Sequence, residues 1–391
     1  MRLFDDIKRE DTGPSLYSEP RFRYLNRSAR PAYYAVREVL EDWFSRYPLP
    51  HQQDLRGRFR STADTNHRAA FFELFMHELL LRLGHKLEVH PAVCGTRKKP
   101  DFQATFGNGE SFYLECVVAT GVSREEAARS AVKNAMQDAL NRLRSPDFFI
   151  GFEVIRTGEA VPSARKIEAF LLEKLASHNP DAADATIRPD GLDCRPRWLW
   201  SEKGWAIEFS IMPKSPNLRG RPGVRPIAAE FEGGGWVDDR TPLRDAILER
   251  AGKYGELDLP FVVAVNSLAD HLGKIDILEA LFGKEQFSFT QTSKGANGPR
   301  LERVPDGVWT SPQGPRYTRL SAVLLIHALF PWNIPRCSPC LYHNPFAEKR
   351  LVSELDRLPK MVAKGERPDW LTGDTLSSIL GLDPNWPGEA W

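Results

Sequence analysis

The stretch from Glu73 to Val118 constrains the fold of this chain most strongly, because helical and strand signals follow one another closely within it. An apolar stripe at helical spacing ends at Gly84, and glycine commonly terminates helices. Short segments of strand-like composition come next, and the turn Gly107-Asn108-Gly109 separates the last two. A helix followed by three short strands predicts an α/β domain.

The helix is expected to begin near Thr65-Asn66, because Asn is a favourable N-cap residue. Glu73 lies beside the apolar stripe, so we expect it to face the edge of the sheet. Glu78 is expected on the solvent side. The residues that form the stripe are Phe72, Phe75, Met76, Leu79, Leu80 and Leu83.

Two acidic residues lie on the predicted strands. Asp101 and Glu115 are 14 positions apart, and the glycine turn between them folds the strands into a hairpin with both acids at the same end. Glu115 occurs within an apolar strand, where an unpaired carboxylate is costly. Carboxylates held by rigid strands form a hard-oxygen site suited to Mg²⁺. The simpler alternative is a surface turn Asp and an edge-strand Glu.

Pro100-Asp101 followed by Glu115 resembles the motif of the PD-(D/E)xK nuclease superfamily, which has the restriction-endonuclease-like fold. The resemblance covers about 50 contiguous residues and a later helix–strand unit. It implies an α/β protein with an αβββαβ core, a mixed central sheet, and Mg²⁺- or Mn²⁺-dependent hydrolysis of phosphodiester bonds. It also implies that Asp101 and Glu115 ligate the metal. Glu73 stands where the family often has a further acidic residue, bound to the metal directly or through water.

The family's motif lysine is missing, since Val117 occupies its position. An amine near the phosphate stabilises the transition state, so a catalytic site needs a replacement. Lys253, at the end of a predicted helix, is the first candidate, and Lys98 and Lys99 are the second. The alternative for Lys253 is an ordinary lysine favoured by the helix dipole at a C-terminus.

Two later helix–strand pairs compete to complete the core. The first is Ser123–Leu143 with Phe148–Ile155, and the second is Thr241–Tyr254 with Pro260–Val265. We favour the second, because Thr at an N-cap followed by Pro is a good helix start and the strand is entirely apolar. The predicted segments are then a helical extension (1–64), the first half of the core (65–122), an α/β insertion (123–239), the second half of the core (240–267) and a C-terminal extension (268–391).

The C-terminal extension is less regular. Residues 268–310 predict one short helix and a polar loop, and Arg319–Leu329 predicts a strand that extends the sheet. The tail from Arg367 is rich in turn residues and is expected to pack on the surface.

The charges of the 391-residue chain nearly cancel, with 53 basic and 52 acidic side chains. Contact with nucleic acid must therefore come from local patches. The patches that could hold phosphates are Arg97, Lys98 and Lys99 beside the predicted site, and Arg219, Arg221 and Arg225 on a Pro/Gly-rich loop.

A cytoplasmic location is expected. The N-terminus is too charged for a secretory signal, and the longest apolar run is interrupted by His327 and Pro331, so no membrane partner is predicted. Five scattered cysteines favour a reducing compartment.

The sequence therefore predicts a metal-dependent nuclease that acts on DNA or RNA, with DNA preferred. The main alternative is a nuclease-like module that has lost activity and serves in nucleic-acid binding or as a structural part. A third alternative is an unrelated α/β protein with a coincidental motif. The sequence is compatible with a homo-oligomer and identifies no partner protein.

Overall fold

A computed structural model of the chain describes residues 1–121, 124–158, 162–191, 194–221, 224, 226, 238–288, 291–292, 295–296, 300–364 and 367–388. The chain divides into two compact units. The first unit comprises Met1–Gly13, Pro20–Gly121 and Val237–Trp391, and the second comprises Pro14–Glu19 and Val122–Trp236. Most of the second unit falls in the part of the chain for which the sequence predicts an insertion.

The first unit is built on an eight-stranded mixed sheet with the order β1-β2-β3-β7-β14-β15-β16-β17. The first three strands form an antiparallel meander, and β3, β7 and β14 then run parallel to one another. The predicted α/β architecture with a mixed central sheet is thus confirmed. The strands are β1 (Lys86–Val89), β2 (Phe102–Thr105), β3 (Ser111–Ala119), β7 (Phe261–Ser267), β14 (Leu320–His327), β15 (Cys340–His343), β16 (Lys360–Lys364) and β17 (Arg367–Leu371).

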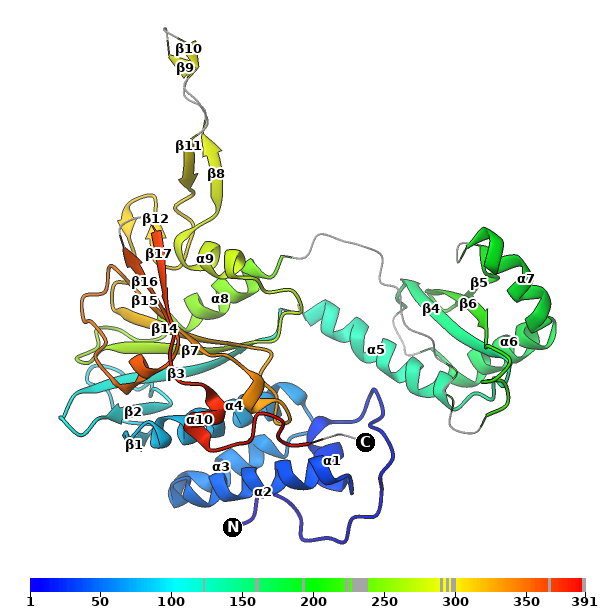
Figure 1. Cartoon of the computed structure of the whole chain (residues 1–391), viewed down its shortest axis with the longest axis horizontal. Helices are drawn as coiled ribbons and strands as arrows, with labels where there is room; N and C mark the ends of the chain where they lie inside the picture. The colour runs from blue at the N-terminus through cyan, green and yellow to red at the C-terminus, as the bar shows by residue number, and fades with distance from the viewer. Residues whose placement is uncertain are drawn as a thin grey trace. The chain divides into compact units, whose positions relative to one another are not determined.

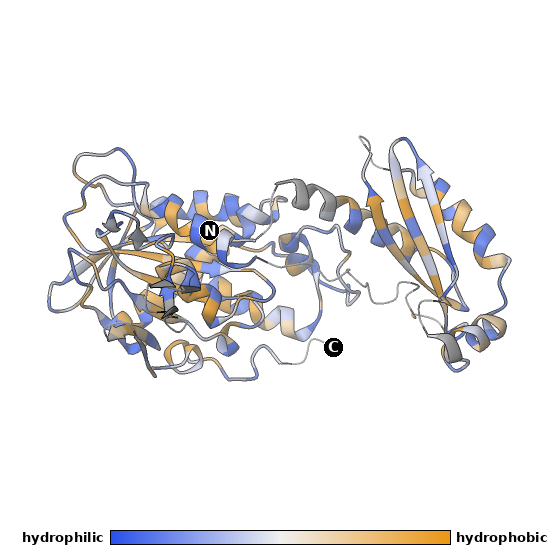
Figure 2. Ribbon diagram, turned by 90° about the horizontal axis from the view of Figure 1, so that it is seen from above, coloured by the Kyte–Doolittle hydropathy of each residue, from blue (hydrophilic) through white to orange (hydrophobic). Residues whose placement is uncertain are grey.

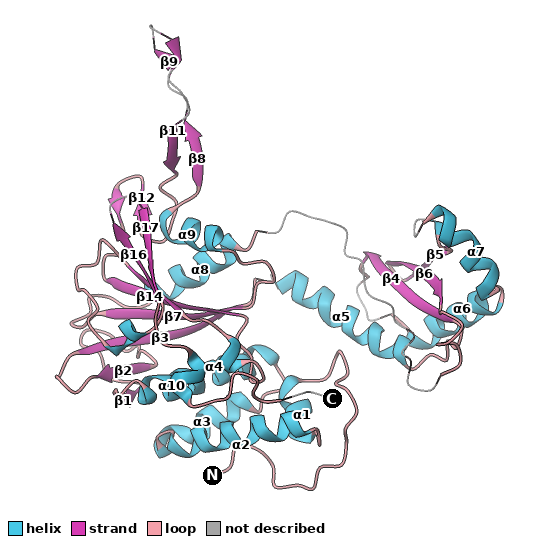
Figure 3. Cartoon of the chain, in the orientation of Figure 1, coloured by secondary structure: helices cyan, strands magenta, loops and turns pink. Residues whose placement is uncertain are grey.

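Helices cover both faces of this sheet (Figures 1 and 3). Side chains alternate between the two faces of a strand. On β3, Leu114 packs towards the N-terminal helices, whereas Tyr113 and Val117 pack towards α8 and α9. Hydrophobic and hydrophilic residues alternate along the helices, as expected of helices that bury one side (Figure 2). The helices are α1 (Arg21–Arg27), α2 (Pro31–Arg46), α3 (Leu49–Phe59), α4 (Asp64–Arg82), α8 (Arg240–Ala251), α9 (Lys274–Phe282), α10 (Leu376–Leu380), and the 3₁₀ turns η2 (Ile334–Arg336) and η3 (Glu354–Arg357).

Helix α4 is buried over most of its length, because the sheet covers one side and α2 and α3 cover another. The helix ends before Gly84, whose φ of +92° suits glycine. The prediction that Glu78 faces solvent is wrong. Its side chain is fully buried and accepts hydrogen bonds from Arg46 and Arg82, at 2.8 Å and 2.7 Å from Oε1. These two cations supply the charge partners that make burial of the carboxylate tolerable.

Helix α8 leads into β7, which pairs with β3, so this helix–strand pair adds the next strand to the sheet. The helix is shorter than predicted, because it ends at Ala251 with Gly252 as its C-cap. Lys253 and Tyr254 therefore follow the helix instead of lying in its last turn. Thr241 is not the N-cap either; its hydroxyl donates to the Asp238 carboxylate at 2.7 Å.

The C-terminal extension contains more strands than the sequence predicts. The expected strand at Arg319–Leu329 is present as β14, but the tail from Arg367 also supplies β17 to the sheet edge. Strands β8 and β11 form an antiparallel hairpin that was not predicted either. The additional short strands are β8 (Glu285–Ser288), β9 (Gln291–Thr292), β10 (Gly295–Ala296), β11 (Arg300–Arg303), β12 (Thr310–Ser311) and β13 (Gly314–Pro315).

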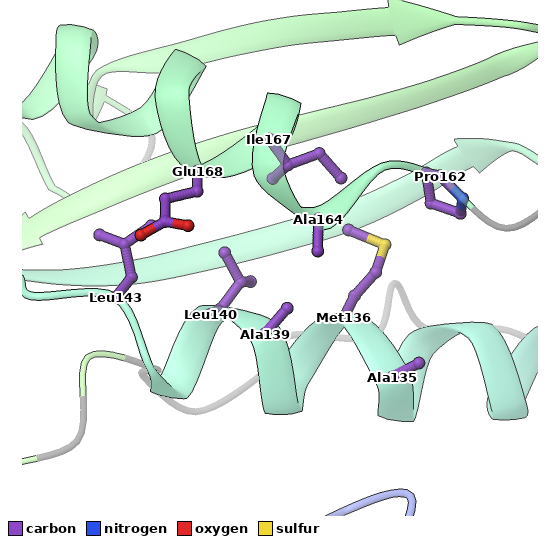
Figure 4. A pocket seen from close by; sticks show the side chains of 9 residues that line it. All are labelled: Ala135, Met136, Ala139, Leu140, Leu143, Pro162, Ala164, Ile167 and Glu168. Carbon is purple, nitrogen blue, oxygen red and sulfur yellow. The ribbon is translucent and has the colours of Figure 1, made fainter.

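The second unit has its own hydrophobic core between helices and a three-stranded antiparallel sheet of order β4-β6-β5. A small apolar cavity of about 100 Å³ lies between α5 and α6, and Met136, Leu140 and Ile167 line it (Figure 4). Among the helices that the structure describes in either unit, none is long and apolar enough to cross a membrane. The elements are α5 (Arg124–Asn141), β4 (Phe148–Arg156), α6 (Ala164–Ala176), α7 (Pro180–Asp190), β5 (Arg197–Glu202) and β6 (Trp205–Pro213).

Candidate functional site

Glu115 lies in the middle of β3, a strand enclosed by β2 and β7. Its side chain is 3% exposed, although it carries a carboxylate. Val117 lies two residues further along and points to the same face, towards α8. A buried carboxylate is tolerated only with strong partners, so the groups around Glu115 define the site.

Three side chains from α8 and the residues after it surround Glu115. The Nζ atom of Lys253 lies 2.6 Å from Oε1, and the Tyr254 hydroxyl lies 2.5 Å from Oε2. Arg250 contributes a second, more distant cation, with Nη1 3.9 Å from Oε1. Both oxygens of Glu115 therefore have partners from the layer that covers this face of β3. Val117 packs into the apolar cluster beneath the same helix.

Tyr254 also links the site to the loop before β2. Its hydroxyl lies 2.8 Å from the carbonyl oxygen of Lys99, two residues before Asp101. The ring is buried and packs edge-on against Phe261. Tyr254 thereby connects the chain around Pro100-Asp101 with the carboxylate of Glu115.

Asp101 lies immediately before β2. Phe102 pairs with Leu114, and continuing this antiparallel register places Asp101 opposite Glu115. Its Oδ2 atom accepts the backbone N–H of Cys116 at 2.7 Å. Burial raises the pKa of Asp101 to about 8, and the negative charges of Glu115 and then Glu73 add to this effect. The Cys116 N–H and the charge of Lys253 lower the pKa of Asp101. Asp101 thus lies in a buried environment next to two other carboxylates.

Glu73 approaches from α4 and is almost fully buried. Its Oε1 accepts a hydrogen bond from the Tyr47 hydroxyl at 2.6 Å, and its Oε2 accepts one from Arg58 Nη1 at 2.7 Å. A second nitrogen of Arg58 lies 3.2 Å from Oε1. Both oxygens are therefore engaged by a bidentate arginine and a tyrosine. The charge of Glu73 still raises the pKa of Asp101, although its oxygens are not free for a metal ion.

The basic residues predicted to bind phosphates are distributed over both units. Arg97, Lys98 and Lys99 are exposed in the loop between β1 and β2, next to the site. Arg219 belongs to the second unit, where it pairs with Asp181 at 2.7 Å, and Arg221 is exposed there. Arg225 lies outside the described residues.

Asp101 and Glu115 are the carboxylates of this site that could hold a metal ion. Burial is the main cause of the raised pKa of Asp101, and a nearby cation would favour the charged form of this carboxyl group. Within the described residues, however, no group of three or more His, Cys, Asp or Glu side chains is arranged to hold a metal. The oxygens of Glu73 are bonded to Arg58 and Tyr47, and those of Glu115 to Lys253 and Tyr254, so an ion held by Asp101 and Glu115 would share the Glu115 oxygens with these partners. Mg²⁺ is commonly bound by one or two carboxylates with water and substrate oxygens completing its coordination.

Sequence reasoning did not identify Arg250, Tyr254, Arg58 or Tyr47 as part of this neighbourhood. The closeness of Arg250 and Tyr254 to Lys253 in the sequence was the available signal. No local signal connects Arg58 with Glu73. That contact depends on how α3 packs against α4.

We compared the chain with protein-family models, with curated proteins and with solved structures, and none of the three comparisons finds a match.

Proposed function

We propose that the first unit is a metal-dependent nuclease of the PD-(D/E)xK type that hydrolyses phosphodiester bonds of DNA. The observation that carries this proposal is the contact between Lys253 and Glu115. Val117 cannot supply the positive charge of the motif lysine. Lys253 comes from the layer that covers the same face of β3, and its amine contacts the carboxylate of Glu115. A short motif in which two of three groups match is weak evidence, and a lysine in contact with one of the matching carboxylates strengthens it.

The order of elements supports the proposal. Helix α4, the meander β1–β2–β3, helix α8 and the parallel strand β7 follow the αβββαβ order expected of a restriction-endonuclease-like core. The second unit interrupts this order between β3 and α8, a position where an added domain leaves the pairing of β3 with β7 intact.

Each residue has a distinct role in this account. Asp101 and Glu115 would hold a Mg²⁺ or Mn²⁺ ion, and Tyr254 fixes the orientation of Glu115. The ion, when bound, polarises the scissile phosphate and lowers the pKa of an attacking water. Lys253 places its positive charge where negative charge develops on the phosphate. Glu73 and Arg58 form the buried ion pair behind Asp101, and Arg97, Lys98 and Lys99 contact flanking phosphates without reading sequence.

A second candidate is a nuclease-like module without activity that binds nucleic acid. The observation in its favour is that both oxygens of Glu115 are already bonded, to Lys253 and Tyr254. Under this alternative the lysine neutralises a buried acid and no metal binds.

Cleavage assays on DNA and RNA with Mg²⁺ or Mn²⁺ separate the two candidates. The nuclease account predicts cleavage by the wild type and none by Asp101→Asn or Glu115→Gln, because each removes a charged metal ligand. Glu88→Gln is a matched control, since Glu88 is an exposed carboxylate on the neighbouring strand β1. Equal cleavage by wild type and both site variants would assign the activity to a contaminant or another site.

A further inference from the structure

A hollow of about 650 Å³ lies in the first unit, between the segment that precedes β7 and the segment that precedes β14. We call it the β7–β14 groove. Its charged and aromatic lining consists of Glu256, Arg316, Tyr317, Arg319, Glu348 and Lys349. Sites that bind small ligands commonly have volumes of about 300–1,000 Å³, so the groove is large enough for a ligand of nucleotide size.

The three cations of the groove donate hydrogen bonds to backbone carbonyls. Arg316 donates to Gly307 at 2.6 Å, Arg319 to Ala251 at 2.9 Å, and Lys349 to Leu257 at 2.6 Å. Within the described part of the chain, none of the three forms an ion pair with a carboxylate. A carbonyl orients a cation but does not cancel its charge. With two glutamates in the lining, the groove therefore keeps a surplus of positive charge for an anionic ligand.

Tyr317 places a partly buried aromatic ring near two of these cations. The guanidinium groups of Arg316 and Arg319 lie 5.5 Å and 5.9 Å from the centre of its ring. Its backbone has a φ of +49°, which is uncommon for a bulky residue. Such strain persists where the surrounding structure imposes it, and it concentrates at functional sites. An aromatic ring among cations matches the needs of a nucleotide, whose base stacks while its phosphates pair with the cations.

The groove and the candidate site share one segment of chain. This segment comprises residues 253–259. Lys253 and Tyr254 at its start contact Glu115, and its later residues line the groove. Arg319 bonds the last residue of α8, and Lys349 bonds Leu257. A nucleic-acid strand held in the groove would therefore lie next to the segment that carries Lys253.

We propose that the β7–β14 groove binds a single-stranded segment of nucleic acid adjacent to the scissile phosphate. Arg316, Arg319 and Lys349 contact its phosphates, and Tyr317 stacks against a base. This inference rests on the proposed function for the position of the scissile phosphate, whereas binding in the groove is testable without cleavage.

Binding of labelled oligothymidylate in EDTA, followed by fluorescence anisotropy against salt concentration, tests the phosphate contacts. Lys349→Glu is expected to weaken binding by about tenfold and to lower the salt dependence, since each phosphate contact on a single strand contributes a slope of about 0.7. Lys349→Arg keeps the charge and should retain the affinity. Lys86→Glu, the same change at an exposed position on β1, is the matched control. Equal affinity of wild type and Lys349→Glu would overturn the assignment.

The aromatic contact has its own pair of variants. Tyr317→Phe keeps the ring and should bind like the wild type, whereas Tyr317→Asn tolerates the positive φ and should lose affinity about fivefold, within the range of one stacked base. Tighter binding of duplex than of single strand, with no effect of Tyr317→Asn, would contradict the inference. Groove-dependent binding by a wild type that cleaves no DNA or RNA would refute the nuclease proposal and leave the binding assignment standing.

Discussion

The amine of Lys253 lies 2.6 Å from a carboxylate oxygen of Glu115, although the two residues are 138 positions apart in the sequence. The second unit is inserted between them. The contact exists because β7 pairs with β3 and α8 packs over the face of β3 that carries Glu115. Lys253 therefore brings a positive charge to Glu115 from the next element of the same sheet.

Metal affinity is expected to depend on pH through Asp101. The pKa of this carboxyl group in the folded protein is about 8, far above its usual value of 3.8. Below pH 8 a metal ion must displace the proton, so affinity should rise with pH up to about 8 and then level off. Mn²⁺ titration by calorimetry at pH 6.5 and 8.5 measures this. Equal affinity at both pH values would contradict the assignment of Asp101 as a ligand, and Asp101→Asn should abolish the pH dependence.

The ion pair of Arg58 and Glu73 is expected to contribute mainly to stability. Arg58→Met leaves a buried carboxylate without its cation, which should cost about 3 kcal/mol of unfolding free energy. The double variant Arg58→Met/Glu73→Leu removes both charges and should recover most of this loss. Urea unfolding of the wild type, the two single variants and the double variant measures the coupling. Additive losses would show that the two side chains do not interact.

Acid should destabilise the first unit through His67. Burial lowers the pKa of His67 to about 4 from its usual 6.5, and its Nδ1 lies 2.6 Å from the carbonyl of Phe59. Between these values the unfolded chain binds a proton that the folded protein does not, so stability falls as pH decreases from about 6.5 to 4. The full loss of unfolding free energy over this pH range is about 3 kcal/mol.

Urea unfolding at pH 7 and at pH 4.5 measures this loss. His67→Gln should show a smaller loss between the two pH values than the wild type. His77, whose pKa burial also lowers to about 4, remains in both proteins and contributes equally. A variant whose loss of stability equals that of the wild type would refute the role of His67.

The local parts of the site were accessible from the sequence, and the non-local parts were not. The glycine turn between β2 and β3 sets the register of the hairpin, and this register brings Asp101 opposite Glu115. The burial of Glu78 could not be predicted from the local sequence. Its position on α4 suggests solvent, and only the packing of α2 brings Arg46 to it.

The position of Lys253 shows the same limit. The sequence predicts the pairing of α8 with β7, but it places Lys253 in the last helical turn. The helix ends at Ala251, three residues before the predicted end at Tyr254, and both Lys253 and Tyr254 then reach Glu115 from the segment after it. The strand β17 was missed for a related reason, since its pairing with β16 is a tertiary contact that turn-rich composition does not reveal.

Single-turnover cleavage by Lys253 variants tests the central claim most directly. Lys253→Ala should lower the cleavage rate by about 10²–10³-fold, the range found when one group that stabilises transition-state charge is removed, with little change in Mn²⁺ affinity. Lys86→Ala, an exposed lysine on β1, is the control for loss of charge alone. Thermal unfolding of each variant confirms that the protein is folded.

The decisive variant restores the motif lysine in the Lys253→Ala background. Because residue 117 points to the same face of β3 as Glu115, the double variant Val117→Lys/Lys253→Ala should recover at least about tenfold of the lost rate. Recovery at position 117 would show that Lys253 performs the role of the motif lysine. Equal single-turnover rates for the wild type and Lys253→Ala, or a folded double variant no faster than Lys253→Ala, would contradict the account.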